Sequence, residues 1–145
     1  MIYCFFAISH DRRRIFHSNA TKLPTSAWVC QQLREAFPDD SAPKYLIFDN
    51  GSQFNADVVQ AIQSFGITPK RTSFQSPWQN GVAERFVANC RRDLLDHVIA
   101  LNARHLKRLM DEYVHYYNED RTHLAFRSKH PIVESQPISC GRAAS

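Results

Sequence analysis

Hydrophobic residues occur along the chain in two patterns, as short continuous runs and at spacings of three and four residues. Short apolar segments of β-type predict four strands, over residues 2–8, 14–19, 44–48 and 67–72. Apolar residues at helical spacing predict four helices, over residues 25–37, 55–65, 82–101 and 104–117. Strands that alternate with helices in this way favour an α/β fold.

Capping and breaking residues set the expected ends of the first two helices. Thr25 and Asn55 precede them, and each has a side-chain oxygen that can accept hydrogen bonds from the free amides of a first helical turn. Pro38 and Gly66 follow them, at positions where a helix commonly stops. The apolar stripe of the next helix continues without such a break, which predicts one long helix over residues 82–101.

Length and composition restrict the class of protein. The chain has 145 residues, 43% of them hydrophobic and 12% aromatic, which is enough for one domain with a buried core. No apolar run approaches the roughly 20 residues of a membrane helix, and the opening segment lacks the basic lead and cleavage site of a signal peptide. We therefore expect neither a membrane-spanning nor a secreted protein. Residues 1–126 are expected to form the domain, and residues 127–145 a loose tail.

Positive charge is concentrated in one part of the sequence. The whole chain has a net charge of +4. Residues 70–108 contain eight basic and three acidic side chains, a surplus of five, so the remainder of the chain is slightly acidic. A concentrated positive field favours a polyanionic partner such as a nucleic acid. On charge alone, a solvated charged helix face explains the pattern equally well.

One aspartate stands where ligands bind in open α/β sheets. Asp49 directly follows the apolar run 44–48, at the carboxyl end of the predicted strand. Asn50 and Gly51 allow a sharp turn after it, which leaves the carboxylate at the mouth of the sheet. Taken alone, these residues are more simply explained as an ordinary turn.

A glutamate occupies the first turn of the long predicted helix. The helix dipole favours an acidic side chain there, which is a sufficient structural reason for Glu84. Together with Asp49, however, Glu84 forms a pair of carboxylates that can converge on a hard divalent cation such as Mg²⁺. Two such ions can activate a water or a 3′-hydroxyl in phosphodiester chemistry and stabilise the leaving oxygen. The basic side chains near Glu84 would then hold phosphates.

Three motifs resemble, in order, those of one enzyme superfamily. The segment LIFDNGSQF (46–54) is similar to the second-aspartate motif of DDE-type retroviral integrases and transposases. SPWQNGVAERF (76–86) is similar to the segment that carries their glutamate, and Glu84 follows Asp49 by 35 residues, close to the spacing typical of the family. YYNEDRTHLAF (116–126) is similar to the closing signature of bacterial insertion-sequence transposases. The resemblance covers nearly the whole chain.

The resemblance implies a fold, a chemistry and a set of contacts. The fold would be RNase H-like, a central mixed sheet flanked by helices, and the activity would be DNA cleavage and strand transfer. Asp49 and Glu84 would be catalytic residues that hold two Mg²⁺ or Mn²⁺ ions. The partners would be the element ends, the target DNA and sister subunits of the full-length protein, in the bacterial cytoplasm and on the nucleoid when DNA is bound. Together with the concentration of positive charge, the resemblance implies that these residues contact DNA: Lys70, Arg71, Asn80, Gly81, Arg85, Arg91 and Arg92.

The chain departs from the family pattern at its N-terminus. The first catalytic aspartate of the family lies on a strand upstream of the segment FFAISHDRRRIFH, and this chain begins at the second strand. Asp11 falls in a predicted turn and is not expected to replace it. The helix-turn-helix expected ahead of the core is absent as well. We therefore interpret the chain as an N-terminally truncated core, with weakened metal binding and without a central strand of the sheet.

Three functional hypotheses remain open from the sequence. The first is an active catalytic core for DNA integration and transposition. The second is a catalytically inactive remnant that binds DNA or oligomerises without cleavage. The third is a fragment without a stable fold. Metal-dependent nicking, salt-sensitive binding without nicking, and a broad thermal transition are the observations that separate them.

Overall fold

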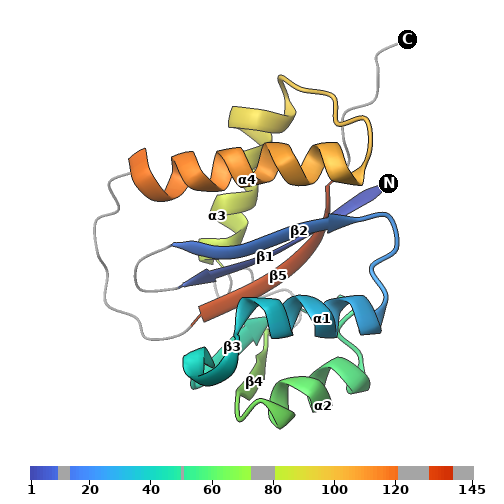
Figure 1. Ribbon diagram of the computed structural model, residues 1–145, viewed down its shortest axis with the longest axis vertical. Coiled ribbons are helices and arrows are strands. Elements are labelled where there is room, and N and C mark those ends of the chain that lie inside the picture. The colour runs from blue at the N-terminus through green and yellow to red at the C-terminus, as the bar shows by residue number, and fades with distance from the viewer. Residues whose placement is uncertain (10–13, 50, 73–80, 121–130, 139–145) are drawn as a thin grey trace.

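A five-stranded sheet lies between two pairs of helices in the computed structural model (Figure 1). The structure describes residues 1–9, 14–49, 51–72, 81–120 and 131–138. The strands are β1 Ile2–Ser9, β2 Ile15–Thr21, β3 Tyr45–Phe48, β4 Thr68–Arg71 and β5 Pro131–Ile138. The helices are α1 Ser26–Ala36, α2 Ala56–Ser64, α3 Gly81–Cys90 and α4 Ala103–Asp120. No helix in these ranges is long and apolar enough to cross a bilayer.

The order of the sheet is β2-β1-β5-β3-β4, and the strands are mixed in direction. β1 runs antiparallel to both β2 and β5, whereas β3 runs parallel to both β4 and β5. β5, the last strand in the sequence, therefore stands in the middle of the sheet. It joins the N-terminal hairpin to the parallel pair β3 and β4. The α/β class and the central mixed sheet predicted from the sequence are confirmed.

For residues 131–138, β5 contradicts the prediction of a loose tail over residues 127–145, while residues 127–130 and 139–145 lie outside the described part of the chain. Residues 131–138 pair with β1 along their whole length. Prolines were the reason to expect a loose chain, but Pro131 is the first residue of the strand, where a missing amide is tolerated. Pro137 lies in register beyond the end of β3, so its missing amide breaks no bond to that strand. The predicted vacancy in the centre of the sheet is therefore filled.

β1 contributes to a hydrophobic core on each face of the sheet. Its successive side chains point to opposite faces, as in any strand. Phe6 and Ile8 lie in the core formed with α3 and α4, and Phe5 and Ala7 lie in the core formed with α1 and α2. The ring centroids of Phe6 and Phe86 of α3 are 4.7 Å apart. Burial on both faces explains why the sequence of β1 is apolar almost throughout.

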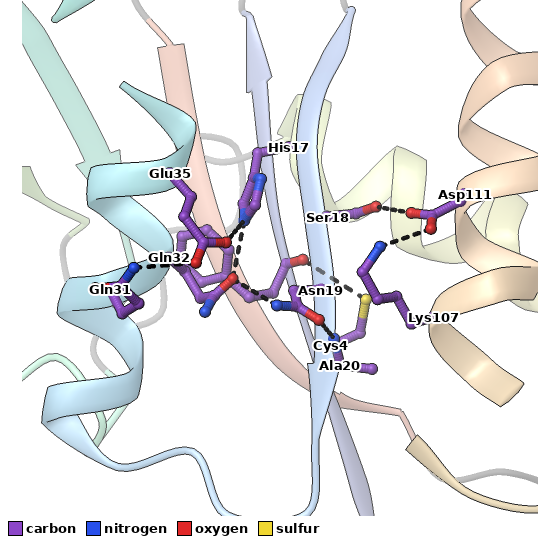
Figure 2. Close-up of polar contacts among 11 residues, drawn as sticks. Cys4, His17, Ser18, Asn19, Ala20, Gln31, Gln32, Glu35, Lys107 and Asp111 are labelled. Carbon is purple, nitrogen blue, oxygen red and sulfur yellow. Dashed lines mark hydrogen bonds and ion pairs between the residues drawn. The ribbon is translucent and has the colours of Figure 1, made fainter. Parts of the chain in front are cut away.

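Alternate side chains of the edge strand β2 bind a helix on each face of the sheet (Figure 2). On one face, His17 Nε2 lies 2.9 Å from Gln32 Oε1 of α1, and the Asn19 amide donates to the same oxygen at 2.8 Å. On the other face, the Ser18 hydroxyl donates to Asp111 of α4 at 3.5 Å. His17, Ser18, Asn19 and Asp111 line a hollow of about 440 Å³. Because they bind one another, we assign them a structural role.

Both predicted N-caps are confirmed. The Thr25 hydroxyl oxygen accepts the amide of Trp28 at 3.2 Å, in the first turn of α1. The Asn55 side-chain oxygen accepts two amides in the first turn of α2, at 3.1 and 3.2 Å. Gly66 follows α2 with φ of +75°, a conformation that glycine adopts without steric cost. Local sequence therefore decides where these two helices begin and end.

The single long helix predicted over residues 82–101 is wrong in its second half. α3 ends at Cys90 and passes into a π-helical turn, Arg91–Leu95. There the amide of Asp96 donates to the carbonyl five residues earlier, at 2.8 Å. The next helix starts after Asn102, whose side-chain oxygen accepts an amide of its first turn at 2.9 Å. The apolar residues keep their helical spacing beyond the residue at which the α-helix ends. The periodicity therefore did not reveal this break in the helix.

This break distinguishes two leucines. Leu106 of α4 is fully buried, whereas Leu101 belongs to the apolar stripe but is 79% exposed. We expect Leu106→Ala to lower the free energy of unfolding by about 2–5 kcal/mol, because apolar burial is removed and a cavity remains. Leu101→Ala is expected to change it by less than about 0.5 kcal/mol. Urea unfolding followed by circular dichroism measures both, and equal effects would favour a continuous helix.

Candidate functional site

Asp49 directly follows β3, at the carboxyl end of a parallel strand. Its side-chain oxygen accepts the amide of Gly51 at 2.9 Å, which forms the predicted turn. Burial raises the pKa of the Asp49 carboxyl above its ordinary value, while the Gly51 amide and the positive charge of Arg71 oppose this rise. The ionised carboxylate is thus partly removed from water and only partly compensated. A further cation beside it would favour the ionised form.

Glu84 lies in the first turn of α3 and is exposed. The helix is held in place by buried residues such as Phe86, whose ring packs against β1. Asn80 and the other residues of the segment 73–80, predicted to be a loop, lie outside the described part of the chain. Gly81 is the first residue of α3, and a Cβ atom there would meet no other atom within 4 Å. Space alone therefore does not explain the glycine at position 81.

The chemistry of Asp49 and Glu84 fits a hard divalent cation, because carboxylate oxygens are the ligands that Mg²⁺ prefers. Among the side chains that the structure describes, no three His, Cys, Asp or Glu are grouped so that they could hold a metal ion. Asp49 and Glu84 are the two ligands that the sequence analysis expects, and their role stays a prediction.

The arginines of α3 and the π-helical turn differ in their surroundings. Arg92 is held by its neighbours, since its guanidinium group donates to Asn89 at 2.9 Å and to Asp93 at 3.1 Å. Arg85, Arg91 and Arg92 are all exposed. All three guanidinium groups are therefore accessible to a polyanion, but binding of Arg92 to DNA would compete with its present hydrogen bonds.

The two basic residues at the end of β4 also differ. The Arg71 guanidinium donates to the carbonyl of Phe54 at 2.6 Å, and its central carbon lies 5.4 Å from the ring centroid of Phe48. Lys70 is exposed, with its ammonium group 5.4 Å from the ring centroid of Tyr45. Arg71 therefore anchors the segment that follows Asp49, and Lys70 is the more accessible of the two.

A surface hollow of about 690 Å³ opens beside the turn that follows Asp49. Three of its lining residues, Ser52, Gln60 and Gln63, are exposed and polar. Hydroxyl and amide groups of this kind contact the sugar–phosphate backbone in protein–DNA complexes. The complete lining is Gly51, Ser52, Phe54, Asn55, Ala56, Val59, Gln60, Gln63 and Arg71.

The elements that carry the predicted site residues are connected through β5. α3, with Glu84, contacts β5, and β5 pairs with β3, after which Asp49 follows. Lys70 and Arg71 lie on β4, on the other side of β3. The sequence analysis assigned no role to residues 131–138. The signal that could have found this strand is the β-branched pair Ile132 and Val133.

The two basic residues of β4 give contrasting expectations. Arg71→Gln should lower the free energy of unfolding by about 1–3 kcal/mol, because the Phe54 carbonyl loses its charged donor. The matched variant Lys70→Gln removes the same charge and should change stability by less than about 0.5 kcal/mol. Urea unfolding measures both. Similar small effects would contradict an anchoring role for Arg71.

Comparison with known proteins finds relatives among transposases. The profile of the family described as "Integrase core domain" matches residues 65–131. The putative transposase InsD for insertion element IS2E of Escherichia coli (strain K12) is 32% identical over 101 residues, which are 69% of this chain and 46% of that protein. The transposase InsD for insertion element IS2A/D/F/H/I/K of Escherichia coli is also 32% identical over 101 residues, which are 69% of this chain and 34% of that protein.

The chain thus spans less than half the length of these two relatives. The region matched by the family profile includes Glu84, all of α3 and all of α4. Asp49 and the motif around it lie before the matched region. On these grounds the chain belongs to the family of DDE-type integrases and transposases.

Proposed function

We propose that the chain carries the catalytic region of a transposase, which cleaves and joins DNA with Mg²⁺ or Mn²⁺ on an RNase H-like fold. The observation that carries the proposal is the placement of Asp49 after β3 and of Glu84 on α3, two elements that both contact β5. The relatives are transposases by name, which supports a role in transposition. Since the chain spans less than half of each, the activity, DNA substrates and sister subunits of a whole transposase all belong to this proposal.

Asp49 and Glu84 hold the metal in this proposal. When bound, a pair of divalent ions would activate a water or a 3′-hydroxyl for attack and stabilise the leaving oxygen. Asp49 is half-buried and its pKa is raised by burial, so a cation beside it favours the ionised form that a ligand requires. Glu84 is exposed in the first turn of α3, so its carboxylate is accessible to a metal ion.

The accessible basic residues hold the phosphates of the DNA. Arg85 is exposed directly after Glu84, and Arg91 is exposed about two helical turns beyond it. Lys70 is exposed on β4. Arg71 and Arg92 act indirectly, because each is hydrogen-bonded to neighbouring protein groups. The polar hollow beside Asp49 accommodates the sugar–phosphate backbone. Asn80 and Gly81 shape the loop that leads to Glu84.

A second candidate function is binding of DNA, or of sister subunits, without cleavage. It is supported by the incomplete ligand set among the side chains that the structure describes. In this candidate, the arginines and the lysine bind phosphates whether or not a metal ion is held. The two candidates differ in one observable, which is metal-dependent breakage of the DNA strand.

The nicking of supercoiled DNA in Mg²⁺ or Mn²⁺ tests the first candidate. We expect Glu84→Gln to reduce the nicking rate about 100-fold or more, since metal ions contribute several kcal/mol to such reactions. Glu112→Gln removes the same charge from an exposed position of α4 and should leave the rate unchanged. A folded chain that binds DNA but nicks none of it would favour the second candidate. Equal rates in both variants would exclude Glu84 from catalysis.

The salt dependence of DNA binding tests the proposed binding of phosphates. Removal of one basic side chain that binds a phosphate reduces the slope of log K against log salt concentration by about one. We therefore expect Arg91→Gln to lower the slope by about one, for DNA of any sequence. Arg34→Gln is the matched control, because Arg34 is exposed on α1, which packs on the opposite face of the sheet. This variant should leave the slope unchanged. Fluorescence anisotropy at several salt concentrations measures both, and an unchanged slope in Arg91→Gln would remove this residue from the interface.

A further inference from the structure

The segment that connects the π-helical turn to α4, residues 96–102, presents two large apolar side chains to solvent (Figure 1). Ile99 is 64% exposed and Leu101 is 79% exposed, whereas Ala100 between them is buried in the core formed with α3 and α4. Ala100 therefore anchors the segment, and its two neighbours face outward. Single exposed hydrophobic residues are common on protein surfaces, but a pair on one short segment indicates a contact surface.

Hydrogen bonds hold the backbone of this segment at both of its ends. Near its start, the amide of His97 donates to the carbonyl of Leu94 at 3.1 Å. Near its end, the amide of Leu101 donates to Nδ1 of His105 at 3.2 Å. The apolar pair is thus presented on an ordered backbone, so a partner that binds it does not bear the entropic cost of ordering a loop.

Positive charge flanks the apolar pair on both sides in the sequence. Residues 91–108 contain five basic and two acidic side chains, a surplus of three. One of the two acids, Asp93, accepts hydrogen bonds from Arg92 at 3.1 Å and from the Tyr113 hydroxyl at 3.3 Å, which compensates part of its charge. The surface is therefore complementary to a polyanion. The exposed basic residues are Arg91, Arg92, Arg104 and Arg108.

One helical path leads from the candidate site to this segment. Glu84 lies in the first turn of α3, and the π-helical turn that follows α3 ends at Leu95, eleven residues later. At about 1.5 Å per residue, this path is roughly 15 Å long. Base pairs of DNA follow one another at about 3.4 Å, so a duplex that runs along α3 from Glu84 reaches the segment after roughly four or five base pairs. The segment thus continues the surface that we propose for DNA.

We propose that Ile99 and Leu101 form an apolar wedge that enters a base step of the bound DNA and bends the duplex. The arginines on either side of the wedge hold the adjacent phosphates. The proposal rests on the DNA binding in the proposed function and deepens it, because it names a bent duplex as the form that is bound. Proteins that bend DNA insert apolar side chains such as Leu and Ile between base pairs, and the burial of apolar surface offsets the cost of unstacking.

DNA binding by variants of the full chain, measured by fluorescence anisotropy at several salt concentrations, tests the wedge. The double variant Ile99→Ser, Leu101→Ser should bind a short duplex about ten-fold more weakly at every salt concentration, because apolar contact is lost. Its salt slope should stay unchanged, since no charge is removed. Arg104→Gln should instead lower the slope by about one. Leu23→Ser is the matched control, because Leu23 is 73% exposed between β2 and α1, and it should bind as the unchanged chain does.

Energy transfer between dyes at the two ends of the duplex measures the bend. We expect the unchanged chain and Leu23→Ser to raise the transfer when they bind. The double variant, at concentrations that saturate the duplex, should leave the transfer as it is in free DNA. Equal transfer with the double variant and the unchanged chain would overturn the proposal.

A further measurement covers the case in which the double variant does not fold, which its circular dichroism would show. A fluorescent base analogue that brightens when it is unstacked is placed at successive positions of the duplex, and the unchanged chain is added. Brightening at one base step is expected. Bound DNA that brightens at no position would contradict a wedge.

The outcomes separate this inference from the function on which it rests. If the unchanged chain binds no DNA, the proposed function fails together with the inference. If it binds DNA and the double variant binds and bends DNA equally well, the inference alone is wrong. If the double variant loses self-association in sedimentation but keeps DNA binding and bending, the apolar pair is an interface between copies of the chain and the wedge is excluded.

Discussion

The structure depends on the pairing of β5 with β1. In the part of the chain that the structure describes, β5 is the strand that contacts both the β1–β2 hairpin and the β3–β4 pair. Without it, the amides and carbonyls on that side of β1 would lose their partners in the interior of the molecule, which is costly for buried backbone. The sheet would be divided into the β1–β2 hairpin and the β3–β4 pair. The eight residues of β5 therefore link the two halves.

This constraint also determines where the candidate site can form. Asp49 and Glu84 are far apart in the sequence and belong to different layers, a strand end and a covering helix. Their elements meet because β5 pairs with β3 and is covered by α3. A site assembled in this way is only as rigid as the sheet beneath it. The candidate site can therefore form only when β5 is paired in the sheet.

The basic residues illustrate how packing sorts side chains of one type. In the sequence, Lys70, Arg71, Arg85, Arg91 and Arg92 form one positive segment. In the structure all five are exposed, but the Arg71 guanidinium donates to the Phe54 carbonyl and the Arg92 guanidinium donates to Asn89. A guanidinium group that satisfies a carbonyl or amide stabilises the fold, and it is less available to phosphates. Net charge alone does not distinguish these two uses.

The sequence by itself determined the local elements, the α/β class and the family. Caps such as Thr25 and Asn55 act within one helical turn, and the motifs around Asp49 and Glu84 are short, so neighbouring residues suffice to identify them. Tertiary structure decided the break after Cys90 and the strand at Pro131–Ile138. The apolar period is the same on both sides of the break, and a strand is stable only beside a partner. The partner of β5 is β1, at the other end of the chain, so this strand forms through long-range pairing.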